Sequence, residues 1–175
     1  IDLVMTITNN LRKECLEFLP VSSDKIKILK YGIKESDKTA DKSKIYHKLS
    51  IDENKFTIGV FSRIEEQKGQ HLVVEALNLL YNKNIQLLIV GHCMDEDYKK
   101  NLIDAINRYK LDQKIFFVPF VDNPRDIMEV IDLVVLPTYE ETFGLVVAES
   151  MMCSTPVIGS NSGGVPEIIH DNVNG

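Results

Sequence analysis

Two basic side chains follow the apolar segment Thr57–Ser62. Arg63 and Lys68 are separated by four residues, and a glycine comes directly after the lysine. A guanidinium offers a planar fork of donors and an ammonium offers a point charge, so together they could neutralise a diphosphate, helped by a helix N-terminus. The alternative is that both side chains are solvated and pair with Glu65 and Glu66.

Two carboxylates, Glu141 and Glu149, are separated by seven residues. Glu141 comes just before an expected short helix at Gly144–Cys153, and Glu149 lies about two turns further along the chain. A carboxylate beside the N–H groups of Phe143 and Gly144 offers acceptors and donors to sugar hydroxyls or to a phosphate. As plain structure, Glu141 would cap the helix and Glu149 would be a surface side chain.

A pair of glycines, Gly163 and Gly164, follows the apolar segment Pro156–Gly159. Glycines at the start of a helix allow a backbone to approach a ligand closely. A turn followed by a proline in the first helical turn explains them equally well.

Metal-ligand spacing is absent from the sequence, and so are a Ser-His-Asp pattern and a Walker loop. The absence of a GxGxxG motif disfavours a dinucleotide dehydrogenase. The three cysteines include no CxxC pair, which is typical of reduced cysteines in an intracellular protein. The residues considered are His47, His71, His92, His170, Cys15, Cys93 and Cys153. We therefore expect no metal site.

Short β-branched apolar segments alternate with amphipathic stretches from Phe56 onward, which is the pattern of a parallel sheet covered by helices on both faces. The expected strands are Thr57–Ser62, Gln86–Gly91, Ile115–Val118, Leu133–Pro137 and Pro156–Gly159, and the expected helices are Gln70–Tyr81, Tyr98–Tyr109 and Gly144–Cys153. With right-handed crossovers, this order predicts an α/β fold with a doubly wound parallel sheet. Ligands bind at the carboxyl ends of the strands in such sheets, which is where Arg63 would lie.

The first fifty residues have a different pattern. We expect a strand at Leu3–Thr8, a helix from an N-cap at Asn9 to Phe18, and a strand at Lys25–Leu29. The polar stretch Glu35–Lys44 resembles a linker. The chain is therefore divided into a remnant of another domain (1–34), a linker (35–50) and a main domain (51–175), with truncation expected at both ends.

Composition limits the function classes. The chain has 175 residues, of which 44% are hydrophobic, and 26 acidic residues exceed 20 basic ones, for a net charge of −6. This charge argues against a broad nucleic-acid-binding face. The apolar segments are too short to span a bilayer, and the first residues do not form a signal peptide. We expect a cytoplasmic protein.

Taken in order, the motifs resemble those of one family. The patterns SRxxxxKG, PTxxExFGLxxxE, TPVIxxxxGGxxE and a final NG, spread over about Phe56 to Gly175, resemble the C-terminal, donor-binding domain of GT-B glycosyltransferases of family 4, a retaining group. The resemblance implies a Rossmann-like fold and transfer of a hexose, with retention, from a UDP-, GDP- or ADP-sugar to a glycan or lipid-linked acceptor. It implies no cofactor and no metal, because Arg63 and Lys68 would take the electrostatic role of a metal.

The resemblance also implies a role for each matching position. Arg63 and Lys68 would bind the donor diphosphate, Glu141 would hold the transferred sugar, and these three residues would carry catalysis. Glu149 would bond the nucleotide ribose. The remaining substrate-binding positions are the amides of Phe143, Gly144 and Leu145 near the sugar phosphate, the backbone of Pro119, Phe120 and Val121 near the base, and the glycine pair Gly163 and Gly164.

The sequence departs from the family pattern in three places, which leaves base specificity open. Gly91-His92-Cys93 stands where relatives have GxG, Pro119 where they have glycine, and Tyr31–Lys34 where they have NGvD. Residues 1–34 resemble the last βαβ piece of the acceptor-binding domain, so we expect this chain alone to be inactive. Peripheral membrane association of the full-length protein stays open. Two alternative functions also stay open, namely a sugar-nucleotide epimerase and a non-catalytic nucleotide-sugar binding module.

Overall fold

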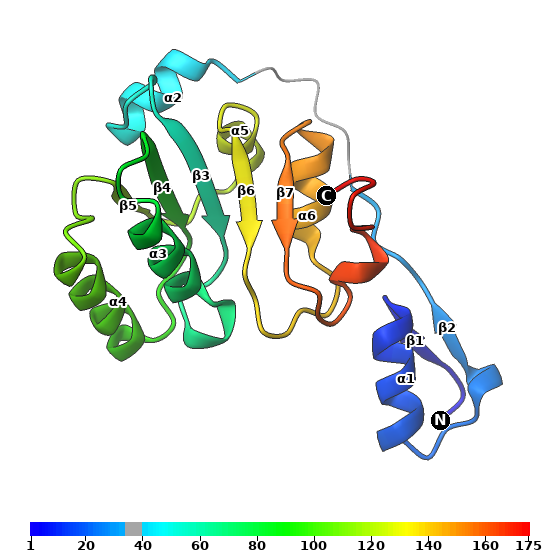
Figure 1. Cartoon of the computed structure of the whole chain (residues 1–175). Helices are drawn as coiled ribbons and strands as arrows, with labels where there is room; N and C mark the ends of the chain where they lie inside the picture. Colours follow the sequence, from blue (N-terminus) through cyan, green and yellow to red (C-terminus); the bar gives the residue numbers. More distant parts are fainter. Residues whose placement is uncertain (34–39) are drawn as a thin grey trace.

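Five parallel strands form the central sheet of the protein. The computed structural model describes residues 1–33 and 40–175, and its main sheet has the order β5-β4-β3-β6-β7 (Figure 1). Its strands are β3 (Phe56–Phe61), β4 (Ile85–Val90), β5 (Ile115–Val118), β6 (Leu133–Leu136) and β7 (Val157–Gly159). The chain builds outward from β3 on one side and then returns to add β6 on the other. This arrangement confirms the doubly wound α/β fold.

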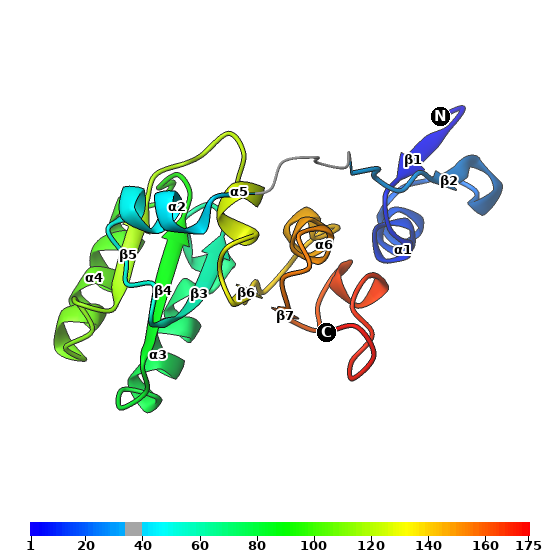
Figure 2. The ribbon, with the colours of Figure 1, turned by 90° about the horizontal axis from the view of Figure 1, so that it is seen from above.

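Helices cover both faces of this sheet, as Figures 1 and 2 show. They are α2 (Lys42–Leu49), α3 (Gln70–Leu79), α4 (Glu96–Arg108), α5 (Arg125–Met128) and α6 (Leu145–Met152), with short 3-10 helices η2 (Glu66–Lys68) and η3 (Val165–Glu167). Alternate residues of β4 face opposite sides: Leu87 and Ile89 pack with α3 and α4, whereas Leu88 and Val90 pack with α2, α5 and α6. Residues 87–90 of this strand are buried on both sides, which explains their continuous apolar sequence.

Helix α2 corrects the expectation of a linker over residues 35–50. Residues 42–49 form a helix that begins after an N-cap at Asp41, whose side chain accepts a hydrogen bond from the Lys44 N–H. Tyr46 is fully buried, and its hydroxyl is 2.9 Å from Thr57 Oγ1 and donates to the Val130 carbonyl at 3.1 Å. Tyr46, with Ile45 and Leu49 packed against the same core, therefore attaches a mostly polar helix to the sheet. Residues 34–39 lie outside the described residues, and the division into domains stays a prediction.

The first part of the chain forms a separate pair of parallel strands, β1 (Val4–Thr6) and β2 (Ile26–Ile28), joined through α1 (Asn9–Phe18) and the 3-10 helix η1 (Ser23–Lys25). The expected N-cap at Asn9 is wrong by one residue. Thr8 has the extended backbone of a cap, and its Oγ1 accepts from the Leu11 N–H, whereas Asn9 is already helical.

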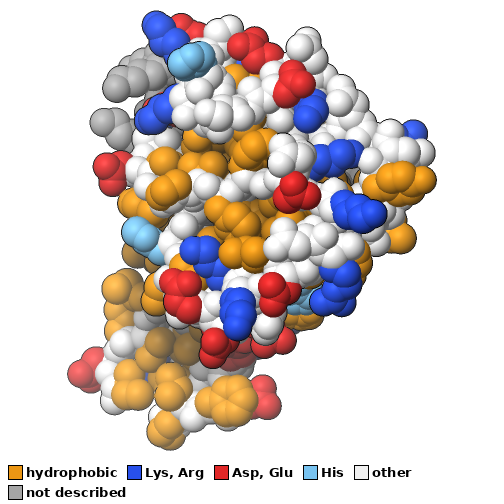
Figure 3. Space-filling view, turned by 90° about the vertical axis from the view of Figure 1, so that its left-hand side faces the viewer, with side chains coloured by type: hydrophobic (Ala, Val, Ile, Leu, Met, Phe, Trp, Pro, Cys, Tyr) orange, Lys and Arg blue, Asp and Glu red, His pale blue; other side chains and the backbone are white. Residues whose placement is uncertain are grey.

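The surface shows no broad basic area on the face seen in Figure 3, where basic and acidic side chains are interspersed around an apolar centre. None of the helices within residues 1–33 and 40–175 is long and apolar enough to cross a membrane.

Candidate functional site

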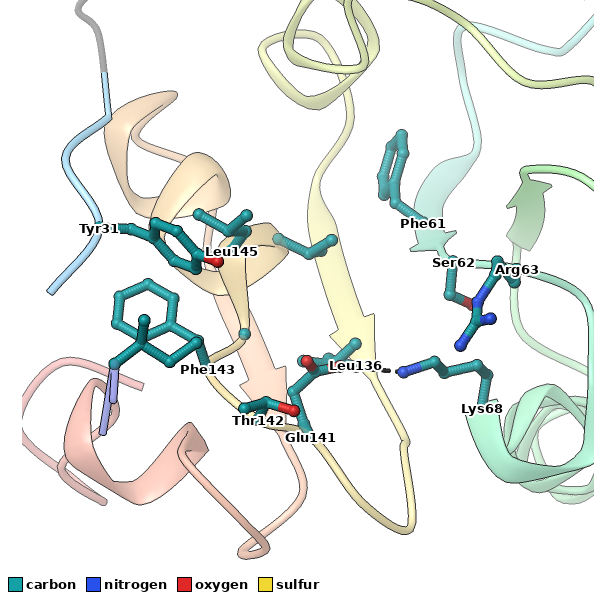
Figure 4. A pocket seen from close by; sticks show the side chains of 13 residues that line it. Tyr31, Phe61, Ser62, Arg63, Lys68, Leu136, Glu141, Thr142, Phe143 and Leu145 are labelled. Atoms are coloured by element: carbon teal, nitrogen blue, oxygen red, sulfur yellow. Dashed lines mark hydrogen bonds and ion pairs between the residues drawn. The ribbon is translucent and has the colours of Figure 1, made fainter. Parts of the chain in front are cut away.

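A cavity of about 320 Å³ lies at the carboxyl ends of β3 and β6, where the order of strands reverses (Figure 4). This position is the usual ligand site of an open α/β sheet. The cavity brings together residues from distant parts of the sequence: Ile7, Tyr31, Phe61, Ser62, Arg63, Lys68, Leu136, Glu141, Thr142, Phe143, Gly144, Leu145 and Val146. Six predicted site residues are among them: Arg63, Lys68, Glu141, Phe143, Gly144 and Leu145.

Lys68 and Glu141 form an ion pair across the cavity. Lys68 Nζ lies 3.1 Å from Glu141 Oε2, and the two side chains are 14% and 21% exposed. Figure 4 shows Arg63 and Lys68 entering from the β3 side and Glu141 from the α6 side. The pairing of Lys68 with Glu66, considered from the sequence, is therefore wrong. A half-buried carboxylate beside two cations can accept hydrogen bonds from hydroxyl groups while the cations face an anion.

The backbone fixes the relative position of Lys68 and Glu141. The Tyr139 N–H donates to the Gln67 carbonyl at 3.0 Å, so the loop after β6 is tied to η2, one residue before Lys68. Gly69 has a φ of 68°, and a Cβ there would overlap the carbonyl of Pro137. A glycine is therefore needed for these two chain segments to approach one another.

Arg63 forms its ion pair with Glu65, at 2.8 Å between Nη2 and Oε1, and its side chain is 56% exposed. This pairing is the one considered as the alternative interpretation of the sequence. The backbone of Arg63 is fixed independently, because its carbonyl accepts a hydrogen bond at 2.7 Å from the buried Gln70 side chain. A surface ion pair of this kind contributes little stability, so an anion in the cavity can compete for the guanidinium at small cost.

Gly144 makes the turn from the loop into α6. It is the N-cap of this helix, with a φ of 93° that a side chain would strain. The first N–H groups of a helix have no acceptor within the helix, and they carry the positive end of its dipole. The backbone at Leu145 and Val146 therefore offers donors beside the Glu141 carboxylate.

Glu149 does not line this cavity. It lies one turn beyond Leu145 and Val146 on α6, and so on the same helix face as these two cavity residues. Desolvation by burial raises the pKa of its carboxyl group, and the charge of Arg125 opposes the rise. The sequence prediction that it contacts a ligand ribose stays a prediction.

Gly163 and Gly164 face the loop of Glu141 rather than the cavity. A Cβ on Gly163 would overlap the Glu141 carbonyl, and one on Gly164 would overlap the Thr142 carbonyl. The Gly164 N–H donates to the Glu141 carbonyl at 2.7 Å. The close approach expected from this pair therefore occurs against protein backbone, and contact of either glycine with a ligand stays a prediction.

A second cavity of about 250 Å³ adjoins the first and shares Phe61, Ser62, Arg63 and Val146 with it. Phe120 and Val121 line this second cavity, whereas Pro119 lines a different one beside α2, and contact of these residues with a base stays a prediction. The ring of His92 stacks on Phe120 with 4.7 Å between centroids and 9° between planes. A flat aromatic surface beside apolar walls suits a planar heterocycle.

Sequence reasoning missed the seven other cavity residues, namely Ile7, Tyr31, Phe61, Ser62, Leu136, Thr142 and Val146. Tyr31 contacts Phe143 edge-to-face, with ring centroids 5.4 Å apart. Ser62 adjoins Arg63 and could have been included from its position at a strand end. Ile7 and Tyr31 lie in the first 33 residues, and no local pattern marks them as neighbours of a segment more than a hundred residues away.

Cys15, Cys93 and Cys153 are free thiols. Across the described ranges, no group of three or more histidine, cysteine or carboxylate side chains is arranged to hold a metal ion. Independence of metal ions stays a prediction.

Residues 41–175 match the model of the family described as glycosyl transferases group 1. The chain belongs to this glycosyltransferase family. The match spans the whole of the main sheet, the second cavity and the lining of the first apart from Ile7 and Tyr31, and the expected family resemblance is confirmed.

Two relatives by sequence are also glycosyltransferases by name. An uncharacterized glycosyltransferase of Methanocaldococcus jannaschii is 32% identical over 98% of this chain, and an O-antigen biosynthesis glycosyltransferase of Escherichia coli is 32% identical over 82% of it. Among solved structures, HepE of Anabaena in complex with UDP and glucose superposes with a TM-score of 0.91 and 28% identity over 99% of the chain. HepE has also been solved with UDP-glucose.

This glycosyltransferase chain spans about half the length of these relatives. It corresponds to 45% of the archaeal protein, 39% of the bacterial protein and 48% of HepE.

Proposed function

We propose that this chain is the donor-binding part of a retaining glycosyltransferase that takes a hexose from a UDP-, GDP- or ADP-sugar and transfers it to a glycan or a lipid-linked acceptor. The observation that carries the proposal is the Lys68–Glu141 pair, with Arg63 beside it, in a cavity at the reversal of strand order. The complexes of HepE with UDP and with UDP-glucose support the choice of a nucleotide sugar as donor.

The two adjoining cavities fit the two ends of such a donor. The base lies in the cavity of Phe120 and Val121, and the diphosphate and sugar lie in the cavity of Lys68 and Glu141, with Arg63 common to both. Glu149 reaches the ribose from the same face of α6. Each end of the donor then meets matching chemistry, since a planar base faces apolar walls and an anion faces cations.

The two cations, Arg63 and Lys68, stabilise the leaving diphosphate. As the bond between sugar and phosphate breaks, negative charge grows on the diphosphate, and preorganised positive groups lower the energy of that state more than that of the bound donor. Arg63 and Lys68 supply this charge. Glu141 accepts hydrogen bonds from sugar hydroxyls and fixes the sugar beside the phosphate.

Calorimetric titration of the 175-residue chain with UDP, GDP and ADP tests this proposal. We expect a dissociation constant for at least one of them in the micromolar to millimolar range, which corresponds to about 4 to 8 kcal/mol, unchanged by Mg²⁺ or a chelator. Lys83→Ala is the matched control, because this exposed lysine precedes β4 and lies at the opposite edge of the sheet. Absence of heat with all three nucleotides at millimolar concentration would refute the proposal.

A further inference from the structure

The loop that carries Glu141 is held by hydrogen bonds to two successive backbone carbonyls. The carbonyl of Glu141 accepts from the Gly164 N–H at 2.7 Å. The carbonyl of Thr142 accepts from the hydroxyl of Thr8 at 3.1 Å, although these two residues are 134 positions apart. With both carbonyls fixed, the peptide planes that lead into Thr142 and Phe143 are fixed as well.

Thr8 satisfies two partners with one hydroxyl. A threonine hydroxyl has one hydrogen to donate and two lone pairs to accept with. Thr8 Oγ1 accepts from the Leu11 N–H at 3.2 Å as the N-cap of α1, and its hydrogen goes to the Thr142 carbonyl. The residue is 1% exposed, so water does not replace either partner. The same atom therefore begins a helix in one part of the chain and holds a loop in the other.

Glu167, at the end of η3, binds the first residues of α1 next to Thr8. Its carboxylate accepts from the Asn9 N–H at 3.0 Å and from the Asn10 N–H at 2.9 Å, one hydrogen bond to each oxygen, and the Asn9 side chain adds a third at 2.9 Å. These backbone donors lack acceptors within the helix, and they lie at its positive end. Desolvation opposes ionisation of Glu167, but the donors outweigh it and lower the pKa of the carboxyl group.

We propose that Thr8 is a positioning residue for the donor site, and that Glu167 keeps it in place. Through the Thr142 carbonyl, Thr8 sets the direction of the loop that presents Glu141 and the N–H groups at the start of α6. The first 33 residues thereby contribute to donor binding through this bond, in addition to the side chains of Ile7 and Tyr31 in the cavity wall. This inference rests on the proposed function for its ligand, although the contacts themselves do not.

The test compares Thr8→Val with Thr8→Ser in the 175-residue chain. Valine keeps the shape and removes the hydroxyl, whereas serine keeps it. We expect Thr8→Val to raise the dissociation constant of UDP by about 5- to 20-fold, and Thr8→Ser to change it by less than about 2-fold. Amide hydrogen exchange of Gly164, whose N–H donates to the Glu141 carbonyl, should become faster in the valine variant and stay unchanged in the serine variant.

The effect of losing a helix cap is controlled with Asp41→Ala, which removes the cap of α2. This helix lines neither of the two adjoining cavities. We expect no change of UDP affinity in this variant. We expect Glu167→Gln to speed exchange of the Asn9 and Asn10 amides and to weaken UDP binding in the same direction as Thr8→Val. Equal affinities of the valine and serine variants, or an equal loss in Asp41→Ala, would overturn the positioning role.

The exchange measurement separates this inference from the proposed function. If the wild-type chain binds none of the nucleotides, the donor proposal fails, and faster exchange of the Gly164 amide in Thr8→Val than in the wild type still supports the hold on the loop. If the Gly164 amide exchanges at the same rate in Thr8→Val and in the wild type, Thr8 does not position the loop, whatever the nucleotide does.

Discussion

Lys68 Nζ and Glu141 Oε2 are 3.1 Å apart, although 73 positions separate the two residues in the sequence. The contact exists because β3 and β6 are neighbours, so that the segments that follow them meet at one edge of the sheet. The pair also has a consequence for binding. In the proposed donor complex, the phosphate competes with Glu141 for the same ammonium group, so each substitution in the pair changes the environment of the other residue.

Arg63→Ala and Lys68→Ala are each expected to weaken nucleoside diphosphate binding by about 1.5 to 3 kcal/mol and to leave binding of the nucleoside nearly unchanged. The reason is that each removes a charge-assisted contact to phosphate and no contact to the base. Calorimetry measures the affinities for UDP and for uridine. Added salt should likewise weaken UDP binding and leave uridine binding nearly unchanged. Equal losses for uridine and UDP would mean that the cations maintain the fold instead.

The substitution Glu141→Gln, added to Lys68→Ala, should restore part of the lost UDP affinity. Without the lysine, the carboxylate faces the phosphate unpaired and repels it, and Glu141→Gln removes that repulsion while keeping the shape. The double variant is therefore expected to bind UDP more tightly than Lys68→Ala alone. Titration of the single and double variants forms a double-mutant cycle, and strictly additive effects would contradict the competition for Lys68.

The two glutamates should differ in kinetics when they are tested in a longer, active protein that carries this sequence. Glu141→Gln should lower kcat more than it changes donor affinity, because the sugar contact gains importance as charge develops during transfer. Glu149→Gln should mainly raise the donor KM through the lost ribose contact. Steady-state kinetics with varied donor measures both, and equal losses with a lower melting temperature would indicate that both residues serve the fold.

Glu149 should also make stability depend on pH. Its folded-state pKa is raised by desolvation, so the folded protein binds the proton more tightly than the unfolded chain does. The contribution of Glu149 to the free energy of unfolding is therefore largest below the ordinary pKa of a glutamate, and it falls as the pH rises through the raised value. Glu149→Gln should have little effect in acid and should raise the melting temperature at neutral pH. A melting temperature that is lower than wild type at neutral pH would contradict this sign.

Tyr46→Phe should lower the free energy of unfolding by about 1 to 3 kcal/mol, because it leaves the buried Val130 carbonyl without the hydroxyl that donates to it. Nucleotide affinity should not change, since α2 does not contact the cavity of Lys68 and Glu141. Urea denaturation measures the first effect and calorimetry the second. Tyr81→Phe is the control, because that side chain is 69% exposed, and a similar loss there would exclude the packing explanation.

Much of the fold is local information that the sequence contains. Segments such as Ile85–Val90 are short, apolar on both faces and β-branched, which is how a strand buried inside a parallel sheet must be composed. The order of strands and helices then limits the topology to a doubly wound sheet, and that topology places the residues after each strand at one edge. The family resemblance then grouped Arg63, Lys68 and Glu141 before their distances were known, and the structure brings the three to one cavity.

Helix α2 and the N-terminal part show where local information ends. Residues 42–49 are polar apart from a few side chains, and their helix depends on Tyr46, whose buried site is formed by Thr57 and Val130 from distant segments. In the same way, Thr8 could be recognised as a residue that begins a helix, but its second partner, Thr142, could not. The sequence by itself determined the strands of the main sheet, the helices α1, α3, α4 and α6 and the charged strand ends, because those properties depend on near neighbours. The tertiary structure alone decided that Lys68 pairs with Glu141 rather than Glu66, and that Thr8 and Glu167 hold the Glu141 loop, because such contacts depend on how segments more than seventy residues apart pack together.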